Sequence, residues 1–214
     1  MSFVLTYTSL VTKIQEIFNR TDNVFLSNIP FWIALGQRRI AHDLKILGLK
    51  VSIDGTLTPS NNLIQKPTRW LNNASFNIGV SSQLDPTRRT TRKQILLRDR
   101  IFCEIYWPNP EIVGEPKYYA DTNYNLWSVY PTPDVAYPYQ LFYFQFPVFI
   151  DETTSTNFLT ESVPELLVNS VCIDAATQIP DLERIPVFTQ MYEKSKASLT
   201  EEDMKRIYDE FSVR

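Results

Sequence analysis

The residues that could carry out chemistry in this 214-residue chain are few and widely spaced. His42 is the single histidine, and no serine or cysteine nucleophile lies beside it in sequence, so a packing or surface role is expected. Cys103 and Cys172 have apolar neighbours (IFCEI and SVCID) and form neither a CxxC pair nor a zinc set, which predicts two small buried thiols. No two of the five glycines are close enough to form a phosphate-binding loop.

Two acidic clusters are the remaining candidates for acid/base or metal chemistry. Asp151 with Glu152, and Glu201 with Glu202 and Asp203, could in principle bind a divalent cation. Both clusters lie at expected element boundaries, where carboxylates favour helix N-termini, and this explanation is sufficient. A glycosidase would need two carboxylates about 5 to 10 Å apart across a cleft, which sequence cannot establish. We therefore expect no enzyme, no metal site and no cofactor.

A basic run, PTRRTTRKQILLRDR at 86–100, is the strongest charged feature. Arg88, Arg89, Arg92 and Lys93 could contact phosphate and, with nearby aromatic rings, bind a single strand, so a single-stranded nucleic-acid binding module is the alternative function. The net charge of −3 and the absence of a recognition-helix or RNA-binding signature disfavour that alternative. A solvated loop, or one that faces a protein partner, is expected instead.

The charge is unevenly divided along the chain. Residues 1–100 hold 14 Lys/Arg against 6 Asp/Glu, whereas residues 101–214 hold 7 against 18, so the halves carry +8 and −11. Such polarity can align copies or partners by electrostatic complementarity. Neutralisation within one molecule is the other interpretation.

The N-terminal 49 residues predict a pair of antiparallel helices. Apolar residues recur at helical spacing over 7–20. Ser27 or Asn28 is expected to cap a second helix with Pro30 in its first turn, and Gly48 is expected to end it.

The middle of the chain is rich in β-strand signals. KVSIDGTLTP predicts a hairpin turning at Asp54-Gly55. RWLNNASFNIGV, KYYAD, LWSVY and YQLFYFQF predict strands, and residues 94–107 fit a short helix or a strand. The segment 126–148, LWSVYPTPDVAYPYQLFYFQFPV, is expected to form an aromatic hairpin about a proline-rich turn.

The C-terminal third predicts two further helices. Ser162-Val163-Pro164-Glu165 has the form of a capping box for a helix that ends near Pro180, and another helix starts near Pro186, with Thr200 as a cap for its continuation. The expected fold is α+β: an antiparallel helical bundle built from the N- and C-terminal helix pairs, with an inserted antiparallel β-rich region. The expected domains are 1–49, 50–150 and 151–214.

The aromatic segment needs a reason to be so apolar on both faces of its last strand. Either it is sandwiched in a core, or another molecule covers one face, because large exposed apolar patches mark interaction sites. Trp127, Tyr130, Phe142 and Phe144 are therefore candidate partner contacts.

The order of four segments resembles a known family. IPFWIALGQRRIAHDL, YPTPDVAYPYQLFYFQFPV, NFLTESVPELLVNSVCIDAA and LERIPVFTQMYEKSKASL occur in an order similar to that of head-to-tail adaptor (connector) proteins of short-tailed bacteriophages, over residues 5–199. The resemblance implies a structural virion protein at the head–tail junction, made in the host cytoplasm. It implies a ring, usually twelvefold, that binds the portal, continues the channel for DNA ejection and meets tail (nozzle or fibre-attachment) proteins.

The same resemblance suggests roles for two segments of this chain. A C-terminal segment can dock on the portal in such proteins, which makes Met204, Ile207, Tyr208 and Phe211 candidate contacts. DNA passing through the ring is expected to slide without specific binding, since tight phosphate contacts would hinder its movement. The basic run at 86–100 is then expected to face a neighbouring protein.

Overall fold

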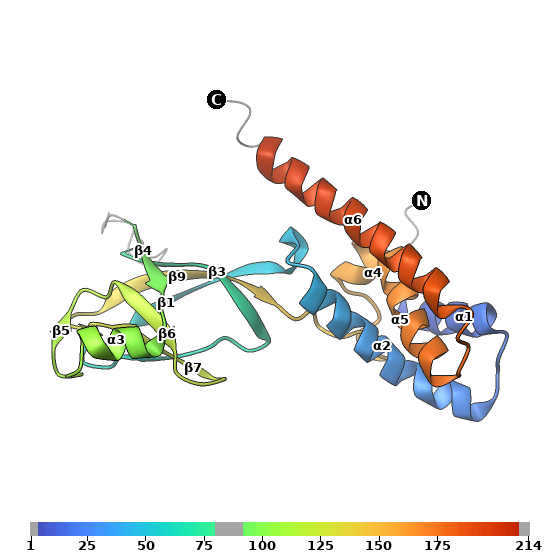
Figure 1. The fold of residues 1–214 in the computed structure, drawn as a ribbon, viewed down its shortest axis with the longest axis horizontal. Helices are drawn as coiled ribbons and strands as arrows, with labels where there is room; N and C mark the ends of the chain where they lie inside the picture. The colour runs from blue at the N-terminus through green and yellow to red at the C-terminus, as the bar shows by residue number, and fades with distance from the viewer. Residues whose placement is uncertain (1–3, 80–91, 210–214) are drawn as a thin grey trace. The chain divides into compact units, whose positions relative to one another are not determined.

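The computed structural model describes residues 4–79 and 92–209, with side chains through Arg206 (Figure 1). The chain divides into two compact units. Unit 1 combines Met1–Leu49 with Phe146–Arg214 and contains most of the helices, whereas unit 2 is Lys50–Gln145 and contains all the strands. None of the helices in the described ranges is long and apolar enough to cross a lipid bilayer.

Unit 1 contains five α-helices and a 3-10 turn within the described residues: α1 Tyr7–Phe18, α2 Asn23–Asp43, η1 Leu47–Leu49, α4 Phe158–Ser162, α5 Pro164–Gln178 and α6 Ile185–Asp209. The first predicted helix is confirmed. Thr6 caps it by accepting the Ser9 N–H, and Asn19 ends it with a left-handed backbone at φ 48°.

The second helix starts earlier than predicted. Asp22, not Ser27 or Asn28, is its N-cap, because its carboxylate accepts the Phe25 N–H at 3.0 Å. Pro30 consequently lies inside α2.

The second helix also ends at Asp43, before Gly48. Gly48 lies in η1 and has a packing role, since a Cβ at this position would lie 2.0–2.4 Å from the ring of Phe158. The expectation that Gly48 ends the helix is therefore wrong.

The predicted capping box at Ser162–Glu165 is also wrong. The box is one helix earlier: the Asn157 side chain accepts the Thr160 N–H, and the Thr160 hydroxyl accepts the Asn157 N–H at 2.8 Å, at the start of α4. α5 then begins at Pro164 without a side-chain cap, because α4 leads directly into it.

Thr200 caps nothing, because α6 runs through it without interruption. Its hydroxyl donates to the Lys196 carbonyl at 2.9 Å.

α5 is the centre of unit 1. Gly36 of α2 packs against Val171 of α5, and a Cβ at residue 36 would lie 2.9 Å from a Val171 methyl. Arg39 donates to the Ser170 carbonyl at 2.9 Å and pairs with the Asp174 carboxylate, which fixes the two helices against each other. α6 packs on α5 through a narrow stripe, and among its described side chains Tyr192 alone is buried.

The predicted architecture, a helical bundle with an inserted antiparallel β region, is wrong. Unit 2 is built on a large, nearly closed sheet of seven strands in the order β1-β9-β3-β4-β6-β7-β2, with one parallel pair, β4 and β6. The short strands β5 and β8 form a second, parallel pair. The bounds are β1 Lys50–Leu57, β2 Leu63–Gln65, β3 Trp70–Ile78, β4 Lys93–Leu97, β5 Val113–Gly114, β6 Tyr118–Asp121, β7 Leu126–Tyr130, β8 Thr132–Pro133 and β9 Tyr137–Gln145.

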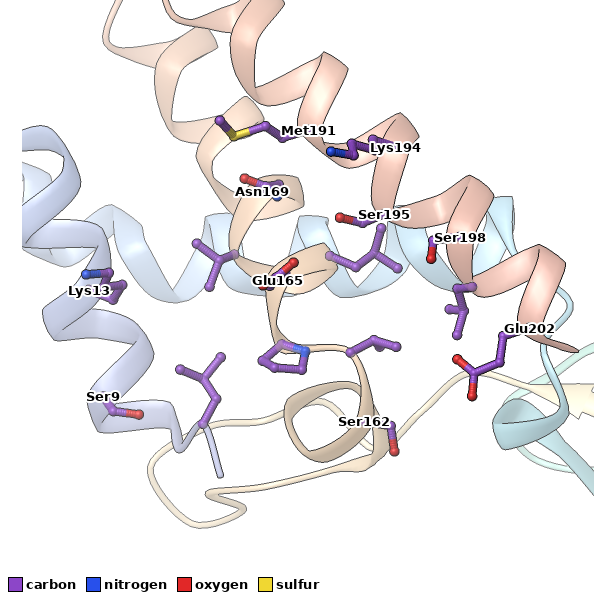
Figure 2. Close-up of a pocket in the computed structure, with 16 residues that line it drawn as sticks. Ser9, Lys13, Ser162, Glu165, Asn169, Met191, Lys194, Ser195, Ser198 and Glu202 are labelled. Carbon is purple, nitrogen blue, oxygen red and sulfur yellow. The ribbon is translucent and has the colours of Figure 1, made fainter. Parts of the chain in front are cut away.

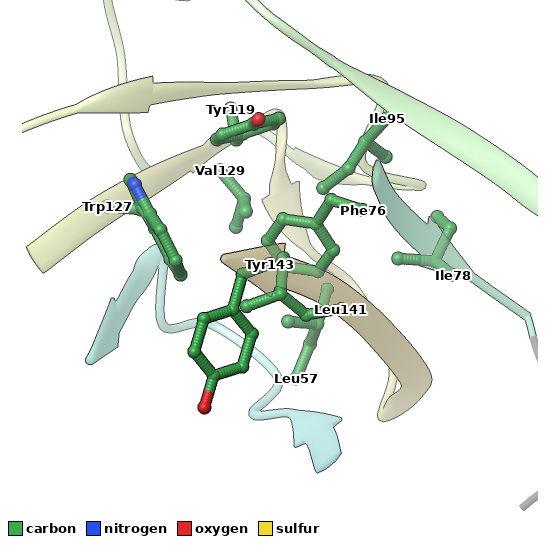
Figure 3. Packing of buried hydrophobic residues seen from close by; sticks show 9 residues of the cluster. All are labelled: Leu57, Phe76, Ile78, Ile95, Tyr119, Trp127, Val129, Leu141 and Tyr143. Carbon is green, nitrogen blue, oxygen red and sulfur yellow. The ribbon is translucent and has the colours of Figure 1, made fainter. Parts of the chain in front are cut away.

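One core explains why the sheet curls. Nine buried side chains from six strands meet in a single cluster, which Figure 3 shows: Leu57, Phe76, Ile78, Ile95, Tyr119, Trp127, Val129, Leu141 and Tyr143. A flat sheet could not bring residues from β1 and β7, which have four strands between them, into one cluster. Strands are confirmed in the segments RWLNNASFNIGV, KYYAD, LWSVY and YQLFYFQF. Pairing between strands that are far apart in the sequence joins them in the seven-stranded sheet.

The aromatic hairpin of residues 126–148 does not form. β7 pairs with β6 and β2, β9 pairs with β1 and β3, and three strands separate β7 from β9 in the sheet. Residues 94–107, left open as helix or strand, supply both: β4, followed by α3 Arg100–Tyr106, capped by Asp99.

The Asp54-Gly55 hairpin also does not form. β1 is one continuous strand that pairs with β9 along its whole length, and Gly55 lies opposite Tyr139. A Cβ at residue 55 would lie 2.5 Å from the Tyr139 ring, so the glycine allows close approach of an aromatic side chain rather than a turn.

This packing makes Gly55→Ala a test of the strand. The added methyl must displace the Tyr139 ring, and we expect the substitution to lower the free energy of unfolding by about 1–3 kcal/mol. Ser52→Ala, at an exposed site on the same strand, is the matched control and should change it by less than about 0.5 kcal/mol. Equal denaturation midpoints for the two variants would contradict this assignment.

Candidate functional site

Unit 1 contains a groove lined by residues of several helices (Figure 2). Its volume is about 1020 Å³, and it lies between the start of α1, the first turns of α5, and the middle of α6. Leu5 and Leu166 are buried beneath it, whereas Met191 is half-exposed at its edge. Its polar lining residues are Ser9, Lys13, Ser162, Glu165, Asn169, Lys194, Ser195, Ser198 and Glu202.

The polar groups of this groove mostly serve the helices that carry them. Ser9 completes the cap of α1, Lys13 pairs with Glu16 at 3.2 Å, and Glu202 pairs with Arg206. Glu165 lies in the first turn of α5, where the helix dipole favours a carboxylate. In the part of the chain that the structure describes, no three His, Cys, Asp or Glu side chains gather as a metal site would require. The groove offers shape and apolar surface.

The candidate reactive residues occupy structural positions. Cys103 and Cys172 are both fully buried, as predicted, and burial raises the pKa of the Cys172 thiol to about 12. Burial, with the Asp99 carboxylate nearby, also raises the pKa of Cys103. His42 packs edge-on against Phe146, with ring centres 5.1 Å apart.

The acidic clusters are likewise engaged locally. The Asp151 carboxylate accepts the hydroxyl of Thr153 at 2.6 Å and the backbone N–H groups of Thr153 and Thr154 at 2.7 Å; these bonds, with the hydroxyl as the largest cause, lower the pKa of Asp151. The second cluster is not at a helix start, contrary to expectation, because α6 runs through it. Glu201 pairs with Lys205 at 2.8 Å one turn along the helix.

Three of the four described cations of the basic run bind polar side chains of unit 2, and the fourth, Arg98, lies over the rings of Phe102 and Tyr118. Arg92 donates to the Gln140 side chain, and Lys93 pairs with Glu115 at 2.5 Å. Arg100 pairs with Glu104 at 2.6 Å. Arg88 and Arg89 lie outside the described residues.

The four aromatic candidates separate into two kinds. Trp127 and Tyr130 are 1% and 7% exposed, so a partner cannot reach them, and their assignment as contacts is wrong because they belong to the interior of unit 2. Phe142 and Phe144 alternate with the buried Leu141 and Tyr143 along β9 and are partly exposed on its other face.

Comparison with protein families decides the identity. The sequence matches the family model of the SU10 adaptor protein over residues 5–212. The chain belongs to the SU10 adaptor protein family. It is therefore a phage adaptor, a structural virion component at the head–tail junction that associates with portal and tail components, and the predicted resemblance is confirmed. No curated protein matches the sequence.

The C-terminal candidates of the adaptor lie on or beyond the end of α6. Met204 is 45% exposed, whereas Ile207 and Tyr208 lie on the helix with side chains outside the described set, and Phe211 lies outside the described residues.

Sequence reasoning missed an exposed apolar surface of the adaptor that lies on α3. Ile101, Ile105 and Tyr106 are 68%, 71% and 65% exposed. Ile101 and Ile105 are one turn apart and opposite the buried Cys103, a spacing that could have revealed a second apolar face once α3 was known to be a helix.

The state of the two thiols gives a direct test of the core. With a pKa of about 12, roughly one Cys172 thiol in ten thousand is ionised at pH 8, and both cysteines are inaccessible. We expect neither thiol to react with a disulfide reagent such as DTNB in the native protein, and both to react in guanidinium chloride. Ser198→Cys, at an exposed site on α6, is the control that should react natively. Reaction of either natural thiol at the rate of that control would contradict the burial described.

Proposed function

We propose that the adaptor assembles into a ring of twelve copies beneath the portal, continues the DNA channel and presents a surface to tail proteins. The observation that supports this proposal is the match to an adaptor family over 5–212, which spans both compact units. Assembly is proposed to take place in the host cytoplasm. A closed ring requires two different surfaces on each copy, and exposed apolar side chains on both units are available for such contacts.

In this proposal the helical segments 1–49 and 151–214 act together as one domain, and 50–150 acts as another. The compact units support the division, because their boundaries fall after Leu49 and Gln145. Counted by unit, charge is distributed more evenly than along the chain: unit 1 holds 11 Lys/Arg and 16 Asp/Glu, and unit 2 holds 10 and 8. Unit 1 therefore carries a net charge of −5 and unit 2 a net charge of +2, a smaller separation than that between the +8 and −11 halves of the sequence.

DNA is proposed to slide through the ring without specific contacts. Three described cations of the basic run support this part, since Arg92, Lys93 and Arg100 are engaged by side chains of unit 2. Strong phosphate binding would instead need unpaired cations and would weaken steeply with salt.

The ring itself is tested by mass. We expect purified adaptor mixed with assembled portal to give one particle whose mass exceeds that of the portal by twelve adaptor copies, measured by native mass spectrometry. Single-stranded DNA should show no saturable binding at low salt. Adaptor that never joins the portal, or that binds DNA with a steep salt dependence, would contradict the proposal and favour the nucleic-acid alternative.

The C-terminal contact with the portal is tested separately. Met204, Ile207, Tyr208 and Phe211 are proposed to dock on the portal, so Met204→Asp should weaken portal binding by about tenfold or more. Thr200→Asp, one turn earlier on the exposed side of α6, is the control and should bind normally. The affinity of both variants for the portal can be measured by biolayer interferometry. Normal binding by Met204→Asp would remove this segment from the interface.

A further inference from the structure

We propose that the exposed face of α3 is the contact by which one adaptor copy holds its neighbour in the ring, and that it receives the outer face of β1 and β9 of the next copy. This inference rests on the proposed ring and assigns the surfaces that close it. The α3 face consists of Ile101, Ile105 and Tyr106 with the aromatic side chains around them. The β1–β9 face consists of Ser52, Asp54, Phe142 and Phe144.

The α3 face is held rigidly although it is exposed. Cys103 packs against Ala120 and Tyr130 on the outer side of the sheet, which fixes the helix. Packed aromatic side chains border this face. The ring centres of Phe102 and Tyr106 are 4.6 Å apart, and those of Trp107 and Tyr118 are 5.7 Å apart. A rigid apolar helix face loses little conformational entropy when a partner covers it.

The composition of this face is that of a protein contact. Its isoleucines and Tyr106 expose more than half of their surface, and a neighbouring strand adds Leu96, which is 46% exposed and is the register partner of Tyr118. The Arg98 guanidinium lies over the rings of Phe102 and Tyr118, at 5.6 and 5.7 Å. Aromatic residues and arginine are enriched where contacts contribute most to binding, and a contiguous apolar patch of this kind is unusual on a surface that stays in water.

The second surface lies on β1 and β9 of the same sheet. Phe142 and Phe144 point away from the core, and opposite them in register are Ser52 and Lys50 of β1. The Lys50 ammonium lies 5.6 Å from the centre of the Phe142 ring, and Asp54 is exposed beside this face. β1 is also the outermost strand at its end of the sheet, so a neighbour can approach it.

The curl of the sheet separates the two faces. α3 covers the outer side of β6, whereas Phe142 and Phe144 lie on the outer side of β9, and these strands are three positions apart in the seven-stranded order. Because all seven strands surround one core, the faces point in nearly opposite directions. Two different surfaces on opposite sides of a unit give head-to-tail contacts that close as rings, whereas one shared surface would give dimers.

The charges of the two faces are complementary. Arg98 is exposed at the border of the α3 face and forms no ion pair among the described residues. Asp54 is exposed on the β1–β9 face and is likewise without an ion pair there. The cations of the β1–β9 face are engaged within the copy, since Lys50 lies over the Phe142 ring and Arg92 donates to Gln140, the strand partner of Asp54. Beside the α3 face, Arg100 is paired with Glu104. A second copy is thus the occupant that this surface fits.

The first experiment places a charge on the α3 face. Ile105→Asp should lower the number of adaptor copies on the portal by at least about tenfold at limiting concentration, measured by native mass spectrometry. Val24→Asp is the matched control, since Val24 is also a helical side chain that is 71% exposed. Unchanged cooperative thermal unfolding of both variants verifies that each is folded. An Ile105→Asp ring of normal occupancy, or equal losses for both variants, would overturn the inference.

The second experiment tests that the two faces meet. Ser52→Arg combined with Asp54→Arg adds one positive charge to the β1–β9 face and reverses one negative charge, both at exposed positions, and should also lose ring occupancy. In a mixture of this variant with Ile105→Asp, each copy keeps one intact face, so alternating copies can make half of the contacts. The mixture should therefore occupy the portal better than either variant alone.

The outcomes distinguish the two proposals. A mixture that binds no better than its components would overturn the pairing of the faces. If wild-type adaptor itself forms no ring on the portal, the proposed function fails; if wild type forms the ring and these variants do as well, only the present inference fails.

Discussion

The position of β9 between two long partners is the constraint on which unit 2 depends. β9 pairs with β1 on one side and β3 on the other over nearly its whole length, so the face of the sheet on which each β9 side chain lies is fixed. Leu141 and Tyr143 enter the core, and Phe142 and Phe144 remain outside. A shift of one residue would exchange these sets, because side chains alternate along a strand. The apolar character of both faces therefore has two causes: one face closes the core, and the other is proposed to meet a neighbouring copy.

Unit 1 obeys a different constraint, the burial of α5. The contact between α2 and α5 requires Gly36, and the Arg39–Asp174 pair adds a specific polar link. Burial raises the pKa of Asp174, and the Arg39 guanidinium offsets this shift only in part. By contrast, α6 contributes little to the core and is supported by ion pairs one turn apart, such as Glu201 with Lys205. A helix of this kind keeps most of its surface free.

The sequence predicted elements well where the signal is local. The helix at α1, the strands at β3, β6, β7 and β9, and the buried cysteines follow from periodicity and composition alone. The errors arose where a local signal has two physical meanings. The dipeptide Asp54-Gly55 favours a tight turn, but its glycine also leaves space for an aromatic ring from a neighbouring strand. Only the pairing of β1 with β9 decides between these two roles. Trp127 was expected at a surface for the same reason, because an apolar strand does not reveal which molecule covers it.

The path of the chain between the two units has a consequence for evolution. The chain passes into the β unit at Lys50 and leaves it after Gln145, and Lys50 is the strand partner of Phe144. The two crossover points are therefore about 5 Å apart, the spacing of neighbouring strands. Excision of the intervening segment would leave ends that a few glycines can rejoin, and a different sheet can be spliced into the same narrow gap. Genetic exchange at these two junctions would replace the whole segment Lys50–Gln145 at once, while the order of the helical segments stays the same.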